Sequence, residues 1–211
     1  MTLWIILTIN SIAMGGLLFL LSSGFSLIFG LMRIPNLTHG SLFMLGAYFG
    51  VTFLRLGINF WIAALLSALV LAVIVAAALW LMLERTRLGA TIRAGVDDPE
   101  MARVTGINVS RLFTAVFCLG SGLAGLAGVL SGPILSVYPG LDAEMLPLAL
   151  IIVILGGAGS LPGALLGSFI VGFIYNFGQV MFPEFAYVVL FLPMVLVLVL
   201  RPQGLFGRQS L

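Results

Sequence analysis

Few side chains in this sequence could do covalent or metal chemistry. The 211 residues include one histidine, one cysteine and nine basic residues, none of them lysine. One histidine and one cysteine cannot form a closed zinc site, and a phosphate-binding loop needs a lysine. No nucleophile–base pair is visible, and no basic face that could bind nucleic acid. We therefore expect no enzyme activity, no metal, no cofactor and no nucleic-acid partner.

The only histidine lies in a polar interruption, residues 33–40, between two apolar runs. Pro35 lacks a backbone donor and disfavours helix in the residues before it. Non-helical backbone at membrane depth is tolerated only where it is buried or lines a cavity. The segment is therefore either a plain cytoplasmic turn or a broken helix that faces a substrate path, and His39 alone is more often a hydrogen-bonding strut than a ligand. The candidate path residues are Asn36, Thr38, His39 and Gly40.

A second polar feature is the charged island at residues 84–111, which holds nine of the sixteen charged residues. Within it, residues 98–106 have the pattern of a short capped helix with one apolar face. This helix is either a solvated connector or a rigid knob that docks into a cytoplasmic protein. The pattern consists of Asp98 at the N-cap, Pro99 at the first position, Glu100 near the positive end, Met101 and Val104 on one face, and Gly106 after the last turn.

The remainder of the chain must position these polar features, and it is apolar. Hydrophobic residues make up 62% of the sequence and charged residues 8%, whereas soluble domains carry about 25% charged residues. The charge-free runs are long enough for helices that cross about 30 Å of hydrocarbon. We expect an all-α, polytopic transmembrane helix bundle that forms a single domain over residues 1–211. Its expected crossings are 3–31, 40–56, 60–83, 112–132, 145–156, 163–181 and 185–200, seven in all.

Sidedness follows from the arginines. The island and the C-terminal end hold most of them, so the positive-inside rule places both in the cytoplasm and the N-terminus outside. The first run lacks a basic leader and is too long for a signal peptide, so we expect a retained span. Segment 145–156 is short and could be a half-helix. Asp142 and Glu144 then lie in an outer loop, where they either mark the water boundary or meet a binding protein.

Small residues recur at helical spacing, at Gly120, Ala124, Gly128 and Gly132 and in two shorter pairs. Such faces let helix backbones approach closely in lipid, either inside one bundle or between subunits. Residues 156–163 are also rich in glycine, but Pro162 stands where a phosphate-binding G-x-G-x-x-G pattern needs glycine. We therefore expect a tight turn there.

Four stretches together resemble a known family: residues 28–48, 85–108, 156–164 and 201–207. They resemble the permease subunit of bacterial ATP-binding-cassette importers for branched-chain amino acids. The sequence Pro-Asn-Leu-Thr-His-Gly at 35–40 resembles the first of the two paired permeases in such importers. The resemblance implies a multi-pass protein of the bacterial inner membrane. It also implies four kinds of partner: a second permease, two cytoplasmic ATPase subunits, a periplasmic substrate-binding protein and the lipid bilayer.

The resemblance further implies that residues 84–111 form a cytoplasmic coupling loop on the ATPase. This agrees with the capped helix and with the missing lysine, because the motor must then be another chain. The coupling residues it implies are Gly89, Arg93, Asp98, Pro99, Glu100, Met101, Ala102, Val104, Gly106 and Ile107.

One departure separates the chain from the family pattern. Family members usually carry a further transmembrane hairpin where this chain has the single span 60–83. Two other functions stay open for this reason: a stand-alone channel or secondary transporter, and a shortened, inactive permease. The absence of a carboxylate within the expected spans disfavours proton coupling.

Overall fold

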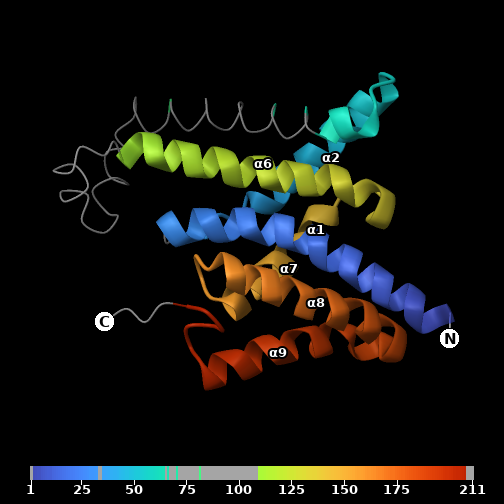
Figure 1. Ribbon diagram of the computed structural model, residues 1–211, viewed down its shortest axis with the longest axis vertical. Helices are drawn as coiled ribbons and strands as arrows, with labels where there is room; N and C mark the ends of the chain where they lie inside the picture. Colours follow the sequence, from blue (N-terminus) through green and yellow to red (C-terminus); the bar gives the residue numbers. More distant parts are fainter. Residues whose placement is uncertain are drawn as a thin grey trace.

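The computed structural model describes residues 2–32, 35–64, 66, 70, 81 and 109–207 (Figure 1). Their secondary structure is helical, which confirms the all-α fold class. The helices are α1 (Thr2–Met32), α2 (His39–Arg55), α6 (Val109–Leu135), α7 (Leu141–Gly156), α8 (Leu161–Met181), the 3₁₀ turn η1 (Pro183–Phe185) and α9 (Ala186–Leu200).

Three described segments are long and apolar enough to cross a membrane: Thr2–Met32, Ser110–Gly132 and Leu161–Met181. Helices α2, α7 and α9 have 17, 16 and 15 residues. At 1.5 Å per residue they measure about 23–26 Å, less than the roughly 30 Å hydrocarbon core. The structure is therefore a bundle of full-length and shorter apolar helices, and the count of seven crossings stays a prediction.

Helix α7 begins earlier than the sequence indicated. The expected outer loop with Asp142 and Glu144 is wrong, because both residues lie in the first turn of α7. The positive end of the helix dipole favours acidic side chains at this position. These two charges therefore mark the beginning of a helix and not a loop.

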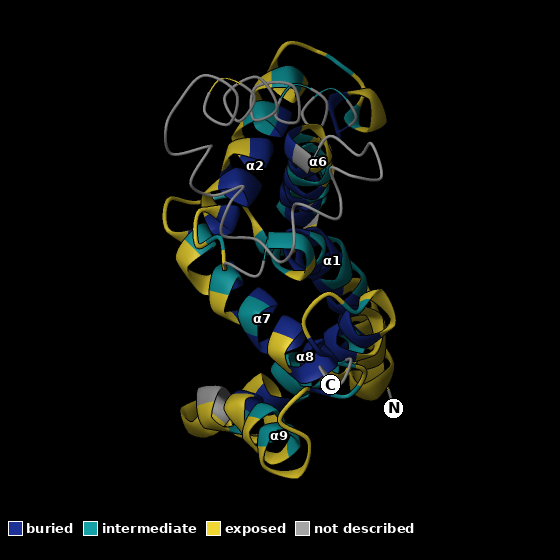
Figure 2. Ribbon diagram, turned by 90° about the vertical axis from the view of Figure 1, so that its left-hand side faces the viewer, coloured by how far each residue is buried: buried dark blue, intermediate teal, exposed yellow. Residues whose placement is uncertain are grey.

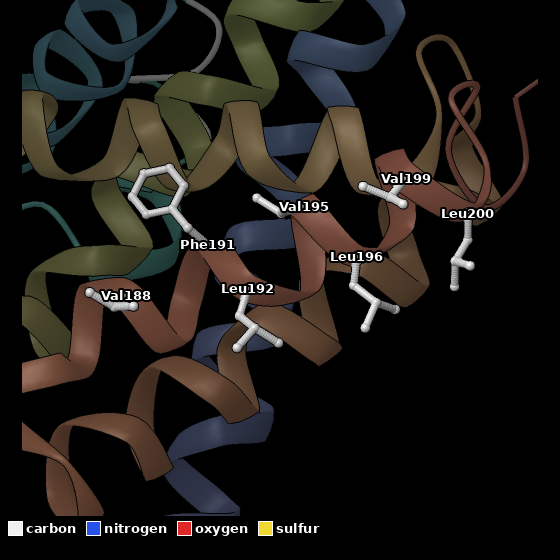
Figure 3. Close-up of a pocket in the computed structure, with 7 residues that line it drawn as sticks. All are labelled: Val188, Phe191, Leu192, Val195, Leu196, Val199 and Leu200. Carbon is white, nitrogen blue, oxygen red and sulfur yellow. The ribbon is translucent and has the colours of Figure 1, made fainter.

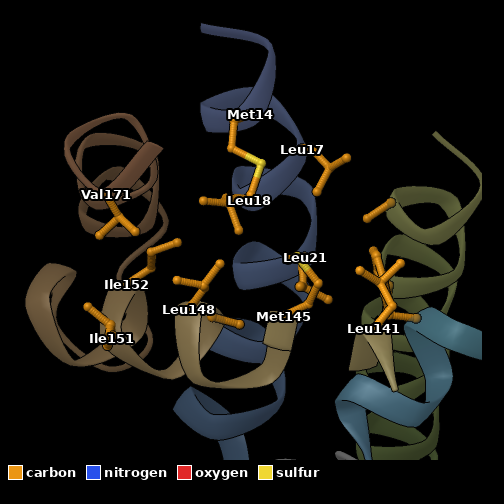
Figure 4. Close-up of a cluster of buried hydrophobic side chains, with 14 of the residues drawn as sticks. Met14, Leu17, Leu18, Leu21, Leu141, Met145, Leu148, Ile151, Ile152 and Val171 are labelled. Carbon is orange, nitrogen blue, oxygen red and sulfur yellow. The ribbon is translucent and has the colours of Figure 1, made fainter. Parts of the chain in front are cut away.

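Helix α1 lies between α6 and α8, and α9 lies at the edge of the bundle (Figures 1 and 2). The buried apolar core collects side chains from α1, α2, α6, α7, α8 and α9. In Figure 4, Leu18 and Leu21 of α1 lie opposite Met145 and Leu148 of α7. The middle of α1 is thus enclosed by other helices.

The helices approach each other at glycines. A β-carbon on Gly24 of α1 would lie 2.5 Å from the carbonyl oxygen of Gly120, and one on Gly172 of α8 would lie 2.8 Å from the nitrogen of Gly15. A β-carbon on Gly46 of α2 would overlap the backbone of Gly125. The small residues of α6 therefore serve packing inside the bundle, which is one of the two roles expected from the sequence.

Candidate functional site

Helix α2 begins beside the middle of α1. The first residue of α2, His39, places its Nε2 3.0 Å from the carbonyl oxygen of Leu21, and its ring meets the ring of Phe25 edge-on at 5.3 Å. Leu21 lies eleven positions before Met32, the last residue of α1. Eleven residues correspond to about 16 Å of helix. The start of α2 therefore lies alongside α1 and not beyond its end, which favours a broken helix over a plain turn at the end of α1.

Asn36 closes the turn that starts α2. Its Oδ1 accepts hydrogen bonds from the backbone N–H of Thr38 at 3.1 Å and from the Thr38 hydroxyl at 2.6 Å. Its carbonyl oxygen accepts a bond from the N–H of His39 at 3.1 Å. Asparagine favours such turns because its side chain can bond to backbone two residues on. The sequence Pro-Asn-Leu-Thr thus provides the turn that leads into α2.

Two polar atoms of this turn stay unpaired. Within the described part of the chain, Asn36 Nδ2 and His39 Nδ1 are buried without a hydrogen-bond partner. A carbonyl oxygen only accepts, so the bond to Leu21 requires the proton on Nε2 of His39, and a neutral ring then offers Nδ1 as an acceptor. Buried polar atoms are nearly always paired. The turn therefore presents one donor and one acceptor that a ligand or water could satisfy.

The first turns of α2 and α7 meet at this site. A β-carbon on Gly40 would lie 3.1 Å from the carbonyl oxygen of Asp142 and 3.1 Å from the β-carbon of Leu146. Neither helix has a side-chain cap at its N-terminus, and such termini carry partial positive charge. The site thus combines two helix N-termini with the carboxylate of half-buried Asp142.

The structure brings together all four candidate path residues, Asn36, Thr38, His39 and Gly40. Their neighbour Asp142 was not predicted, because the expected topology placed it in an outer loop, on the opposite side of the membrane from the cytoplasmic-turn interpretation of residues 33–40. That separation is wrong, since the first turns of α2 and α7 are in contact. The coupling residues from Gly89 to Ile107 lie outside the described residues. Among those that are described, no His, Cys, Asp and Glu group could hold a metal ion.

The glycine-rich turn forms a second structured locus, at the other end of α7. Ser160 caps α8, because its Oγ accepts a bond from the N–H of Gly163 at 3.1 Å, and Pro162 occupies the first turn. This confirms the expected tight turn. A β-carbon on Gly30 of α1 would lie 2.5 Å from the α-carbon of Gly159, so the turn also rests on the end of α1.

Residues 201–207 fold back onto this turn, and we call them the C-terminal clasp. Leu205 donates its N–H to the carbonyl of Leu155 at 2.8 Å, and Phe206 donates to the carbonyl of Gly156 at 3.0 Å. These carbonyls at the end of α7 lack intrahelical partners. The clasp therefore joins two of the four stretches that carried the family resemblance.

Comparison with known proteins identifies the family. The sequence pattern of the family described as "Branched-chain amino acid transport system / permease component" matches residues 7–73 and 67–198. The chain belongs to this permease family.

Curated relatives agree with this assignment. The chain is 38% identical over 132 residues to the high-affinity branched-chain amino acid transport system permease protein BraD of Pseudomonas aeruginosa, covering 62% of this chain and 43% of BraD. It is 34% identical over 152 residues to the corresponding permease LivH of Escherichia coli K12, covering 70% of this chain and 46% of LivH. The fructose import permease FrcC of Rhizobium meliloti is 35% identical over 131 residues, covering 58% of this chain and 36% of FrcC.

These relatives are transport permeases, and the matched part of the chain spans less than half the length of BraD or LivH. No solved structure matches the chain.

Proposed function

We propose that the chain is the transmembrane permease subunit of an ATP-binding-cassette importer that moves branched-chain amino acids inward across a bacterial inner membrane. The observation that carries this is the family match over residues 7–73 and 67–198, in a chain with three described helices of membrane-spanning length. Separate ATPase subunits drive transport, a second permease pairs with the chain, and a periplasmic binding protein delivers the substrate.

Within this proposal, the contact between α2 and α7 forms part of the substrate path. A free amino acid carries a carboxylate and an ammonium group. Helix N-termini favour anions, and broken helices in transporters use them for substrate groups near the membrane midplane. The first turns of α2 and α7 offer such termini, and Asp142 offers a carboxylate for the ammonium. We assign Asn36, Thr38, His39 and Gly40 to this path, with Asp142 as an added member.

A reconstitution experiment tests the function. The chain, its cognate ATPase, the second permease and the binding protein are placed in sealed proteoliposomes, and uptake of labelled leucine, ribose and fructose is measured with and without ATP. We expect leucine uptake that requires ATP. Uptake without nucleotide would support the stand-alone transporter, and sugar uptake would move the chain toward relatives such as FrcC.

The same assay addresses the missing hairpin. The two family matches both include residues 67–73, which supports an internal shortening relative to the family at the expected span 60–83. Removing a hairpin, which crosses twice, leaves the flanking helices on their sides of the membrane. We therefore expect the chain to transport. No uptake beside intact partners, despite normal membrane insertion, would instead support a shortened, inactive permease.

The coupling role of residues 84–111 is tested by binding. Replacing Met101 and Val104 together with aspartate places charge on the expected docking face, so the ATPase should no longer co-purify with the chain. Thr105→Ser changes a residue of the same short helix that is not among the implied coupling residues, and it serves as the control. Undiminished ATPase binding by the double variant would contradict the docking role.

A further inference from the structure

Helix α9 carries an open apolar groove. Its 15 residues contain no charge, and they lie between the acidic Glu184 and the basic Arg201. The groove has a volume of about 920 Å³ and is lined by one helix alone. Figure 3 shows two rows of side chains along this helix: Phe191, Val195 and Val199 in one row, and Val188, Leu192, Leu196 and Leu200 in the other.

The seven side chains that line the groove are all exposed. Val199 and Leu200 are 77% and 71% exposed, and Figure 2 shows α9 at the edge of the bundle with a largely exposed surface. A surface of this kind must be covered by lipid or by another protein. The residue types that line the groove indicate whether lipid or another protein covers it.

Several close backbone approaches between helices of this chain are made at glycine, as at Gly15 with Gly172, Gly24 with Gly120 and Gly46 with Gly125. Close helix packing in lipid generally needs small residues, because the backbones must approach. The groove of α9 is lined only by valine, leucine and phenylalanine. Its lining therefore lacks the small residues that allow two helices to pack closely. Its bulky branched side chains leave furrows suited to a flexible hydrocarbon chain.

The positive charge of Arg201 at the end of the groove indicates which kind of lipid headgroup would bind there. Arg201 directly follows Leu200, and its side chain is exposed. At about 23 Å, α9 is shorter than the hydrocarbon core, so Arg201 can extend its long side chain to the headgroup layer. A guanidinium binds phosphate through paired hydrogen bonds. The apolar groove and the terminal cation are thus complementary to the two parts of a phospholipid.

We propose that the groove of α9 holds an acyl chain of an anionic phospholipid whose phosphate is bound by Arg201. This site is separate from the substrate path, and it requires neither ATP nor an amino acid. Its test is therefore independent of the proposed transport function.

The test uses the full chain in nanodiscs of phosphatidylcholine that contain a small fraction of phosphatidylglycerol with a diazirine on one acyl chain. After illumination, mass spectrometry locates the attached lipid. We expect attachment concentrated between Val188 and Leu200. Arg201→Gln should lower it several-fold for the phosphatidylglycerol probe and leave a phosphatidylcholine probe unchanged, whereas Arg201→Lys should keep part of it.

Arg55 provides a matched control, because it too is an exposed arginine at the end of a helix, α2. Arg55→Gln should leave attachment at α9 unchanged. Attachment spread evenly over other exposed faces, such as Ile5 and Ile9 of α1, would overturn the proposal, as would an Arg201→Gln variant that behaves like wild type. Disulfide formation between two copies of Val199→Cys that excludes the lipid would show a protein interface instead.

Discussion

The imidazole of His39 joins two helices at one point. Nε2 donates to the carbonyl of Leu21 in α1 while the ring packs edge-on against Phe25, and the side chain is fully buried. The same residue leaves Nδ1 without a partner among the described residues. His39 therefore has a structural contact on one side and an available acceptor on the other.

Replacing His39 by alanine should destabilise the bundle by roughly 2–4 kcal/mol, because a buried ring and one hydrogen bond are lost together. His39→Gln keeps an N–H donor and should lose less. Equilibrium unfolding in mixed micelles measures both variants. An alanine variant as stable as wild type would contradict the structural contact. Reduced leucine uptake by a stable His39→Gln variant would support its place in the path.

A single methyl group tests the glycine contacts. A β-carbon on Gly46 would overlap the backbone of Gly125, whereas one on Gly16 of α1 would meet nothing within 4 Å. Gly46→Ala should therefore cost about 1–3 kcal/mol through overpacking. Gly16→Ala should be neutral or stabilising by up to about 1 kcal/mol, because alanine favours helix over glycine. Thermal unfolding of the purified chain compares the two, and equal midpoints would contradict the packing seen here.

The C-terminal clasp is the element that holds the end of α7. Gly204 has a φ of +80°, and a β-carbon there would lie 2.5 Å from the nitrogen of Gly157. Gly57 has the same φ of +80° but open space around it. Comparing Gly57 with Gly204 separates backbone strain from steric contact. A side chain would be strained by the positive φ at both positions, but only at Gly204 would it also meet a neighbouring segment.

Gly57→Ala should cost about 1–2 kcal/mol from the left-handed conformation alone. Gly204→Ala should cost more and should release the clasp. Hydrogen exchange at Leu205 and Phe206, whose N–H groups bond to α7, should then speed up at least tenfold in Gly204→Ala and stay unchanged in Gly57→Ala. Unchanged exchange in both variants would show that the clasp does not depend on glycine at this position.

Sequence patterns were sufficient to predict where most helices and the glycine-rich turn lie. Charge-free runs placed the ends of α1, α2, α8 and α9 within a few residues, and Pro162 with its glycines indicated the turn before α8. The contact between Gly40 and Asp142 and the bonds from the clasp to α7 could not be predicted in this way. Each joins residues at least fifty positions apart, and hydrophobic periodicity describes only the near neighbours of a residue along one element.

The arrangement of the whole bundle predicts which surfaces face each side of the membrane. The end of α1 rests on the turn after α7, close to the clasp, whereas α6 ends at the opposite side (Figure 1). In a Cys118→Ser background, Gln203→Cys should react with an impermeant thiol reagent only from the cytoplasmic side. Ser136→Cys, just after α6, should react only from outside. Both residues are exposed, and labelling of both from one side would contradict the arrangement.

The clasp also sets an order of events during synthesis. Leu205 lies fifty positions after Leu155, whose carbonyl it bonds. At 5–20 residues per second, a ribosome needs roughly 3–10 s to make that stretch. During this interval α8 and α9 are made, while two carbonyls at the end of α7 still lack their final partners. Closure of this end of the bundle is therefore a late step in biogenesis, and a nascent chain arrested before residue 204 would be open to recognition by membrane quality control.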